Sequence, residues 1–258
     1  MASYIDKKIR KGVRVIPSQT IEKRYLLRLE SVCGAMFDAD NASVRRASVR
    51  AIVKSQATSI ATEFVRECVF NSSVNSRKAV SRLAKRGSSP DYYGDTPQLA
   101  RAELALLREN IELINSIPDK YYEKVDKARR ELSGEALEKR LLDIRRITLN
   151  RAKLIARDQN NKAAEGLALR RFKDNGIQYV MWRHSYASAV PRDYHKRKWD
   201  GHSGIRNGKP NGLNGFVFRI DNPPVIDLKT GERGYPSQLI NCRCFLIPVQ
   251  FSPRTLDK

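Results

Sequence analysis

NGIQYVMW, residues 175–182, is the stretch at which this chain of 258 residues changes its character. Before it, apolar residues recur at three- and four-residue steps, which is the period of a helix with one buried face. Gly176 suits the left-handed position beyond a helix end, and Ile177 to Trp182 are rich in residues that favour strands. The sequence therefore predicts an α+β protein, with a long, mostly helical N-terminal part and a small C-terminal module that contains a short β-sheet and long loops.

The helical part is expected over residues 18–175, after a basic arm over residues 1–17. Cap and stripe signals predict antiparallel helices in a bundle, with a seam between subdomains at residues 87–95. We expect a first helix over about 20–37. The second begins after the capping residues 38–41 and includes the apolar stripe from Val49 to Cys68, and a shorter helix follows around 77–85. Three more are expected to begin at Thr96-Pro97, at a capping-box restart at Ser116-Ile117-Pro118-Asp119, and at Glu135, the last reaching Asn175 with a break near 148–150.

The C-terminal module is expected over residues 176–258. Three runs rich in β-branched and aromatic residues predict its strands, and they cover residues 177–182, 216–220 and 245–249. The connection from Gly201 to Gly215 is rich in glycine and asparagine, which indicates a long surface loop.

The formal net charge of +21 is the strongest compositional feature. So large an excess of Lys and Arg costs self-repulsion unless an anionic partner absorbs it. The excess is spread along the whole chain, which favours contact with the phosphate backbone of nucleic acid over sequence readout by one helix. The alternative is a basic protein whose charge serves solubility.

Several common functions lose support because their motifs are absent from the sequence. There is no Walker loop, dinucleotide fingerprint, HExxH or GxSxG. The amino terminus lacks the apolar region of a secretory signal, and no run of about 18 apolar residues occurs. We therefore expect a soluble protein that is not exported by the usual route.

The four cysteines fall into two groups. Cys33 and Cys68 lie on the apolar stripes of expected helices, where a reduced cysteine behaves as a small hydrophobe. Cys242 and Cys244 are separated by one residue, and a disulfide between them would be strained. The pattern favours a reducing compartment over a disulfide scaffold.

Short motifs occur in a fixed order over roughly residues 150–250. They are Ala156-Arg157-Asp158-Gln159-Asn160, Gly176-Ile177, Trp182, Arg192 with His195, Asp200-Gly201, and Asn241-Cys242-Arg243-Cys244. In this order they resemble the phage head morphogenesis family, which is typified by the F-type minor head protein of phage Mu. The chain departs from the family pattern in having no acidic residue between Trp182 and Arg192.

The resemblance implies a minor capsid protein, present in a few copies at the portal vertex or in the capsid interior, and in the host cytoplasm during assembly. Its partners would be the portal protein, the major capsid protein and packaged double-stranded DNA, with no membrane and no small-molecule substrate. The implied role is structural, so no catalytic residue is assigned. One face of the second expected helix could rest on phosphates or be a solvated basic face, and it carries Arg45, Arg46, Arg50 and Lys54.

Three interpretations of the histidines and cysteines in the last third stay open. His195, His202, Cys242 and Cys244 offer four ligands for a structural zinc ion. Alternatively, the cysteines pack in a small core with Arg243 turned outward. In the third interpretation, His195 or His184 is the general base of a small phage-encoded nuclease. A nucleic-acid-binding protein without sequence preference and without a phage role is a further alternative.

Overall fold

A computed structural model describes residues 9–39, 43–83, 96–186, 192–199, 205–206 and 209–251. The chain forms two compact units, and the helices α2 (Ser43–Ser81), α3 (Pro97–Glu131) and α4 (Gly134–Asp174) contribute to both. Unit 1 comprises Met1–Pro17, Val69–Ala102 and Asn161–Lys258, and unit 2 comprises Ser18–Cys68 and Glu103–Asn160. The expected α+β fold class, with a helical N-terminal part, is confirmed.

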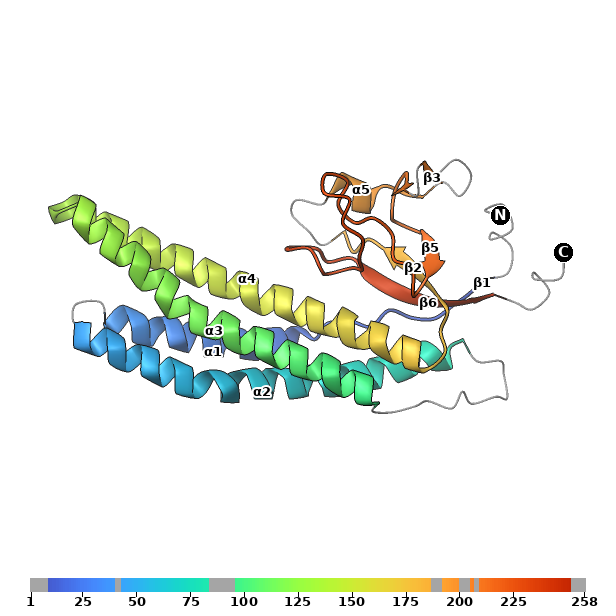
Figure 1. Cartoon of the computed structure of the whole chain (residues 1–258), viewed down its shortest axis with the longest axis horizontal. Coiled ribbons are helices and arrows are strands. Elements are labelled where there is room, and N and C mark those ends of the chain that lie inside the picture. Colours follow the sequence, from blue (N-terminus) through green and yellow to red (C-terminus); the bar gives the residue numbers. More distant parts are fainter. Residues whose placement is uncertain are drawn as a thin grey trace. The chain divides into compact units, whose positions relative to one another are not determined.

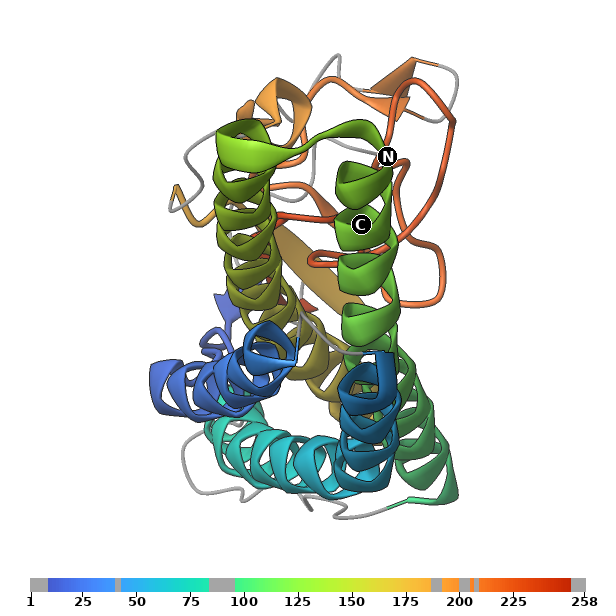
Figure 2. The same ribbon diagram turned by 90° about the vertical axis from the view of Figure 1, so that its left-hand side faces the viewer.

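Unit 2 consists of α1 (Gln19–Asp38) and parts of α2, α3 and α4, which run side by side (Figures 1 and 2). The helix α1 begins where the Ser18 hydroxyl accepts a hydrogen bond from the Ile21 N–H, as an N-cap does. Tyr25 of α1 stacks on Phe64 of α2, and its hydroxyl donates to the Asn110 side chain of α3 at 2.8 Å. Asn110 in turn donates to Gln159 of α4, so one buried network ties the four segments together.

The helices of the structure are longer and fewer than the sequence predicts. The expected restart at residues 116–119 is wrong, because Pro118 lies inside α3. The apolar face of Ile114, Ile117 and Tyr121 stays buried through that turn and carries the helix past the proline. The segment expected at 77–85 is the end of α2 as far as Ser81, and α4 has no break at 148–150.

The predicted helix boundaries hold where they rest on cap chemistry. The Thr96 hydroxyl accepts a hydrogen bond from the Leu99 N–H at 3.1 Å, at the start of α3. Gly134 and Gly176 have φ angles of 56° and 71°, the left-handed conformation that glycine adopts at little cost. The caps expected at residues 40 and 41 and the seam at 87–95 lie outside the described residues.

Unit 1 contains an antiparallel sheet of four strands in the order β1-β6-β2-β5. Its strands are β1 (Ile9–Lys11), β6 (Phe245–Phe251), β2 (Tyr179–Arg183) and β5 (Val217–Arg219). Three of them were expected, but β1 lies in the segment that was expected to be an arm. Its sequence, Ile-Arg-Lys, has no alternation of apolar and polar residues that would predict a strand.

The core of unit 1 lies on one face of this sheet. Alternate residues of β2, Val180 and Trp182, point into it, and Ala168 and Phe172 of α4 pack against them. Met181, between those two strand residues, packs on the other face. Trp182 pairs with Leu246 across the sheet, and both side chains are buried. The tryptophan therefore lies where the strands and the helix α4 meet in the core.

Three short elements complete the described part of unit 1. The helix α5 (Asp193–Lys196) turns Tyr194 and His195 toward the core. The strands β3 (Ile205–Arg206) and β4 (Lys209–Pro210) form a small hairpin within the glycine-rich connection. His195 therefore reaches the core from the single helical turn of α5.

Candidate metal centre

His195 lies at the centre of a buried cluster in unit 1 and is only 2% exposed. Its Nε2 is 2.8 Å from the carbonyl oxygen of Ile226. A carbonyl can only accept a hydrogen bond, so Nε2 carries the proton and donates it. Nδ1 of the neutral ring therefore presents a lone pair, as a metal-binding histidine does when its other nitrogen is fixed by the protein.

Cys242 and Cys244 approach this nitrogen from the turn that precedes β6. Their Sγ atoms lie 3.6 Å and 3.8 Å from His195 Nδ1. The turn is shaped by the positive φ of Asn241, 61°, and is held by the Cys242 N–H, which donates to the Leu239 carbonyl at 3.0 Å. Both cysteines precede the strand, so a turn, and not the alternation of a strand, aims them at one point.

The three side chains offer one nitrogen and two sulfur atoms within 4.8 Å of one another, and all three residues are buried. Among the described residues this is the group of His, Cys, Asp and Glu that could hold a metal ion. The ring of Trp182 packs edge-on against His195, with 5.1 Å between the ring centroids, and excludes water on that side. The geometry fits a small, closed metal centre.

The two thiols differ in acidity. A hydrogen bond with the Cys244 thiol lowers the pKa of Cys242 against the effect of burial. Contact with Cys242 and burial raise the pKa of Cys244. The pair therefore favours one thiolate and one thiol when no cation is present. A divalent cation would neutralise the thiolate and displace the remaining proton, because thiolates are the form that ligates metals.

Glu165 of α4 lies near this cluster, and the sequence analysis did not identify it. It is 4% exposed, and one carboxylate oxygen accepts a hydrogen bond from the Leu246 N–H at 3.0 Å. Burial raises the pKa of Glu165 well above its usual range, and the nearby Cys242 adds to this. The available signal was a single carboxylate among the apolar residues of an otherwise buried helix face, Ala163, Ala164, Leu167 and Ala168.

His184 lies beside the cluster but outside the ligand set. Its Nδ1 accepts a hydrogen bond from the Tyr186 N–H at 3.0 Å, and burial lowers its pKa. Asn214 accepts from the His184 N–H and donates to the Tyr186 hydroxyl, which completes a small polar network. These bonds fix residues 184–186, which directly follow β2.

The remaining predicted motif residues occupy varied positions. Arg192 donates to the carbonyl of Ile240 at 3.1 Å and thereby ties the start of α5 to the cysteine turn. Asn241 adopts the left-handed backbone, and Arg243 is half-buried. Asp200, Gly201 and His202 lie outside the described residues. Of the four predicted metal ligands, the structure thus brings three together.

The basic residues predicted on α2 lie in unit 2. Arg46 forms an ion pair with Asp126, and Arg50 forms one with Asp119 at 3.0 Å. Both guanidinium groups also lie over the ring of Tyr122. Arg45 and Lys54 are exposed. Two of the four cations are thus already engaged by α3, and a phosphate would have to compete with aspartate for them.

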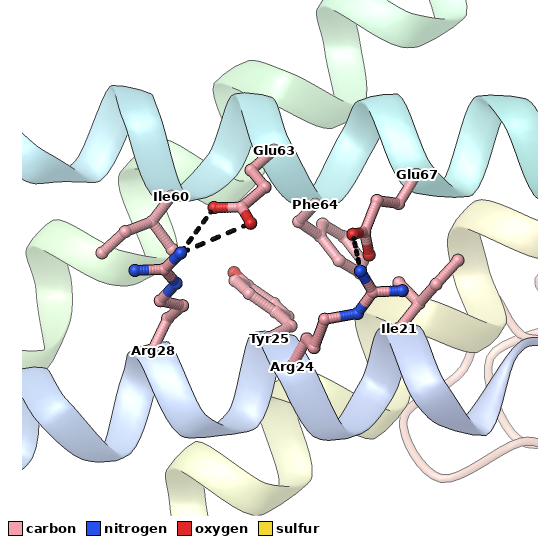
Figure 3. Close-up of a pocket in the computed structure, with 8 residues that line it drawn as sticks. All are labelled: Ile21, Arg24, Tyr25, Arg28, Ile60, Glu63, Phe64 and Glu67. Atoms are coloured by element: carbon pink, nitrogen blue, oxygen red, sulfur yellow. Dashed lines mark hydrogen bonds and ion pairs between the residues drawn. The ribbon is translucent and has the colours of Figure 1, made fainter.

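Unit 2 also has a small hollow between α1 and α2, shown in Figure 3. Tyr25 and Phe64 form its floor, and the ion pairs Arg24–Glu67 and Arg28–Glu63 flank it. Its volume is about 10 Å³. This is room for about one water molecule, so the hollow is a packing feature of the helix pair and not a ligand site.

Within the described ranges, no helix is both long enough and apolar enough to cross a membrane. No family model matches the chain. No solved structure matches it. An uncharacterized protein of Haemophilus influenzae is 28% identical over 237 residues, which cover 86% of this chain and 48% of that protein. The chain thus spans about half the length of this curated relative, whose printed name states no activity.

Proposed function

We propose that this chain is a minor head protein of a tailed phage, which acts in head assembly at the portal vertex and contacts packaged double-stranded DNA. One observation supports this above the others. The motif residues Trp182, His195 and the two cysteines form one buried cluster, although His195 and Cys242 are 47 positions apart. Separated motifs that meet in one cluster act as a single structural unit, and these are the residues that carry the resemblance to head morphogenesis proteins.

The role that we propose is structural. A general base needs a free nitrogen and access to substrate. His195 has neither, because Ile226 engages Nε2, the sulfur atoms face Nδ1, and the ring is buried. The arrangement therefore supports a role for His195 as a metal ligand and does not support a role as the general base of a nuclease. We therefore expect that DNA incubated with the protein stays intact and that His195→Ala leaves this result unchanged.

We propose further that the ion held by the cluster is zinc. A tetrahedral zinc ion with Zn–S bonds of about 2.3 Å and a Zn–N bond of about 2.0 Å separates sulfur from nitrogen by roughly 3.6 Å. The separations in the structure are 3.6 Å and 3.8 Å, so an ion fits with little movement of the ligands. Mixed thiolate and imidazole ligation also favours zinc over magnesium or calcium. A fourth ligand would come from water or from His202.

Elemental analysis of the purified full-length protein tests the zinc assignment. We expect about one zinc per chain, as one closed centre requires. A content near zero after purification without chelators would support the alternative, in which the cysteines only pack in the core. Cys242→Ala should abolish zinc binding, whereas Cys33→Ala, in the other unit, should retain it.

The head-protein assignment is tested by the location of the protein. Quantitative mass spectrometry of purified virions should find it at a few copies per particle, together with the portal protein and the major capsid protein. Heads assembled without it should contain less DNA. Virions that lack the protein, while it accumulates free in lysates, would refute the assignment.

A further inference from the structure

A short basic segment, residues 192–198, surrounds the metal ligand His195. Arg192, Lys196, Arg197 and Lys198 are all exposed, and Asp193 is the one acidic residue among them. Tyr194 and His195 face inward, so the single turn of α5 turns its charged residues outward. His195 and Lys196 belong to α5, and Arg192, Arg197 and Lys198 lie directly beside its two ends, so the candidate metal centre and the cationic surface share one short segment.

The backbone of this segment is fixed on both sides. The Asn214 N–H donates to the Arg197 carbonyl, and the Trp199 N–H donates to the Asn214 carbonyl. Gly212 packs so closely that a Cβ there would lie 2.3 Å from the Arg197 carbonyl oxygen. His195 anchors the other end through Ile226 and the cysteines. Cations on a fixed backbone lose less entropy when they bind a partner than cations on a free chain.

The cations of this segment differ from those of α2. Over the described part of the chain, Lys196, Arg197 and Lys198 form no ion pair with a carboxylate. Arg192 donates to the Ile240 carbonyl and also attracts the Asp227 carboxylate. On α2, Arg46 and Arg50 are already paired with aspartates of α3. The free energy that an anion gains at the basic segment is therefore not reduced by the loss of an existing ion pair.

We propose that the basic segment is the surface that binds the phosphate backbone of double-stranded DNA, and that the metal centre holds it in place. The proposal rests on the proposed function, which supplies DNA as the polyanion. Duplex DNA carries one negative charge per about 1.7 Å of axis, so it can engage clustered cations without base readout. Four neutralised phosphates give a slope of log K against log salt of about −3.6.

Binding of duplexes of two unrelated sequences, measured across a salt series with the full-length protein, tests the proposal. The variant is K196Q/R197Q/K198Q, which keeps side-chain length and removes three charges. We expect equal affinity for both sequences, and a slope that is shallower by about 3 in the variant. A zinc content and a circular dichroism spectrum equal to those of the parent show that the variant is folded.

The matched control is K23Q/R66Q/K124Q, which removes three exposed cations from α1, α2 and α3. It should lower the slope by less than one. An equal loss in both variants would show that net charge alone drives binding, and that result would overturn the proposal. A preference for an acidic peptide over DNA at equal salt would also overturn it.

Removal of the metal tests the second half of the proposal. Protein stripped by a chelator should bind DNA with the shallow slope of the triple variant, and added zinc should restore the parent slope. Unchanged DNA binding after full removal of zinc would refute the role of the metal centre. Failure of these tests leaves the head assignment standing if virions contain the protein, whereas virions without it would remove that assignment even if DNA binding is confirmed.

Discussion

All four cysteines of the chain are buried, yet the two pairs occupy opposite environments. In unit 2, burial raises the pKa of Cys33 and of Cys68 to about 12. In unit 1, Cys242 is equally enclosed, but a hydrogen bond with Cys244 lowers its pKa. Burial alone thus makes a cysteine an inert apolar residue. A second thiol and an imidazole within 4.8 Å make a cysteine able to ligate a metal ion.

The largest effect on zinc content should follow from substitution of His195, because only Cys242 and Cys244 have a histidine beside them. His195→Ala removes the nitrogen ligand and leaves two sulfur atoms, which cannot close a structural zinc site. We expect zinc content to fall from about one per chain to near zero, and the free energy of unfolding in the presence of zinc to fall by about 4 kcal/mol. Elemental analysis and chemical denaturation measure the two quantities.

Cys68→Ala is the matched control for this loss, since it removes a buried sulfur that binds no metal. It should keep the full zinc content. If Cys68→Ala also released zinc, or if His195→Ala kept it, the contrast between the two cysteine pairs would fail.

Unfolding measured at alkaline pH should distinguish Cys33 and Cys68 from Cys242 and Cys244, because this test depends on the first two thiols. The pKa of Cys33 and of Cys68 is near 9.0 in the unfolded chain, and burial raises it to about 12 in the folded one. The unfolded state therefore loses its protons first, and the unfolding free energy should fall between pH 9 and pH 12. The slope is at most about 1.4 kcal/mol per pH unit for each thiol.

The double variant C33A/C68A isolates this contribution from the lysines and tyrosines that titrate in the same range. It should flatten the decline, as measured by urea denaturation at each pH. Zinc-bound thiolates have no proton to lose, so the other pair should add nothing to the slope. A slope that C33A/C68A leaves unchanged would show that these thiols are not the groups responsible.

The smallest effect on the free energy of unfolding should come from replacing Cys68 by a side chain of different size or polarity. Cys68→Ala leaves a void of about one methyl group and should cost about 1 kcal/mol. Cys68→Ser fills the void but buries a hydroxyl, which costs about 1–3 kcal/mol if no partner is found. Serine should therefore be no better than alanine at this position. Thermal unfolding of the two variants makes the comparison, and a stabilised serine variant would contradict the apolar environment.

Local sequence signals predicted much of this fold. They failed where contacts between residues distant in the sequence determine the secondary structure. Thr96-Pro97 and Gly176 mark helix ends correctly, because capping and the left-handed turn depend on neighbouring residues alone. Pro118 reads as a helix start by the same local rules. In the protein, buried contacts of Ile114 and Ile117 outweigh the missing N–H of the proline, and Ser116 donates to the Leu113 carbonyl within that turn.

The residues of the candidate metal centre also differ in whether the sequence predicts them. The sequence analysis identified His195, Cys242 and Cys244 by residue type and by their resemblance to a motif, and the structure brings them together. It did not identify Glu165, since a helix pattern gives no reason for a carboxylate on the buried face. The segment β1 was missed because its three residues become a strand only through pairing with the end of β6.

The hydrogen bond from Leu246 to Glu165 has a further consequence, for association between molecules. The backbone of Trp182 bonds to residues 215 and 216, so the paired Leu246 turns its own N–H away from β2. On that side β1 pairs with residues 249–251 and the Gly12 N–H donates to the Pro248 carbonyl, but no described strand pairs with Leu246. The Glu165 carboxylate occupies the Leu246 donor there. A buried carboxyl group of α4 thus covers the N–H of Leu246, a donor that a strand from another chain could otherwise use.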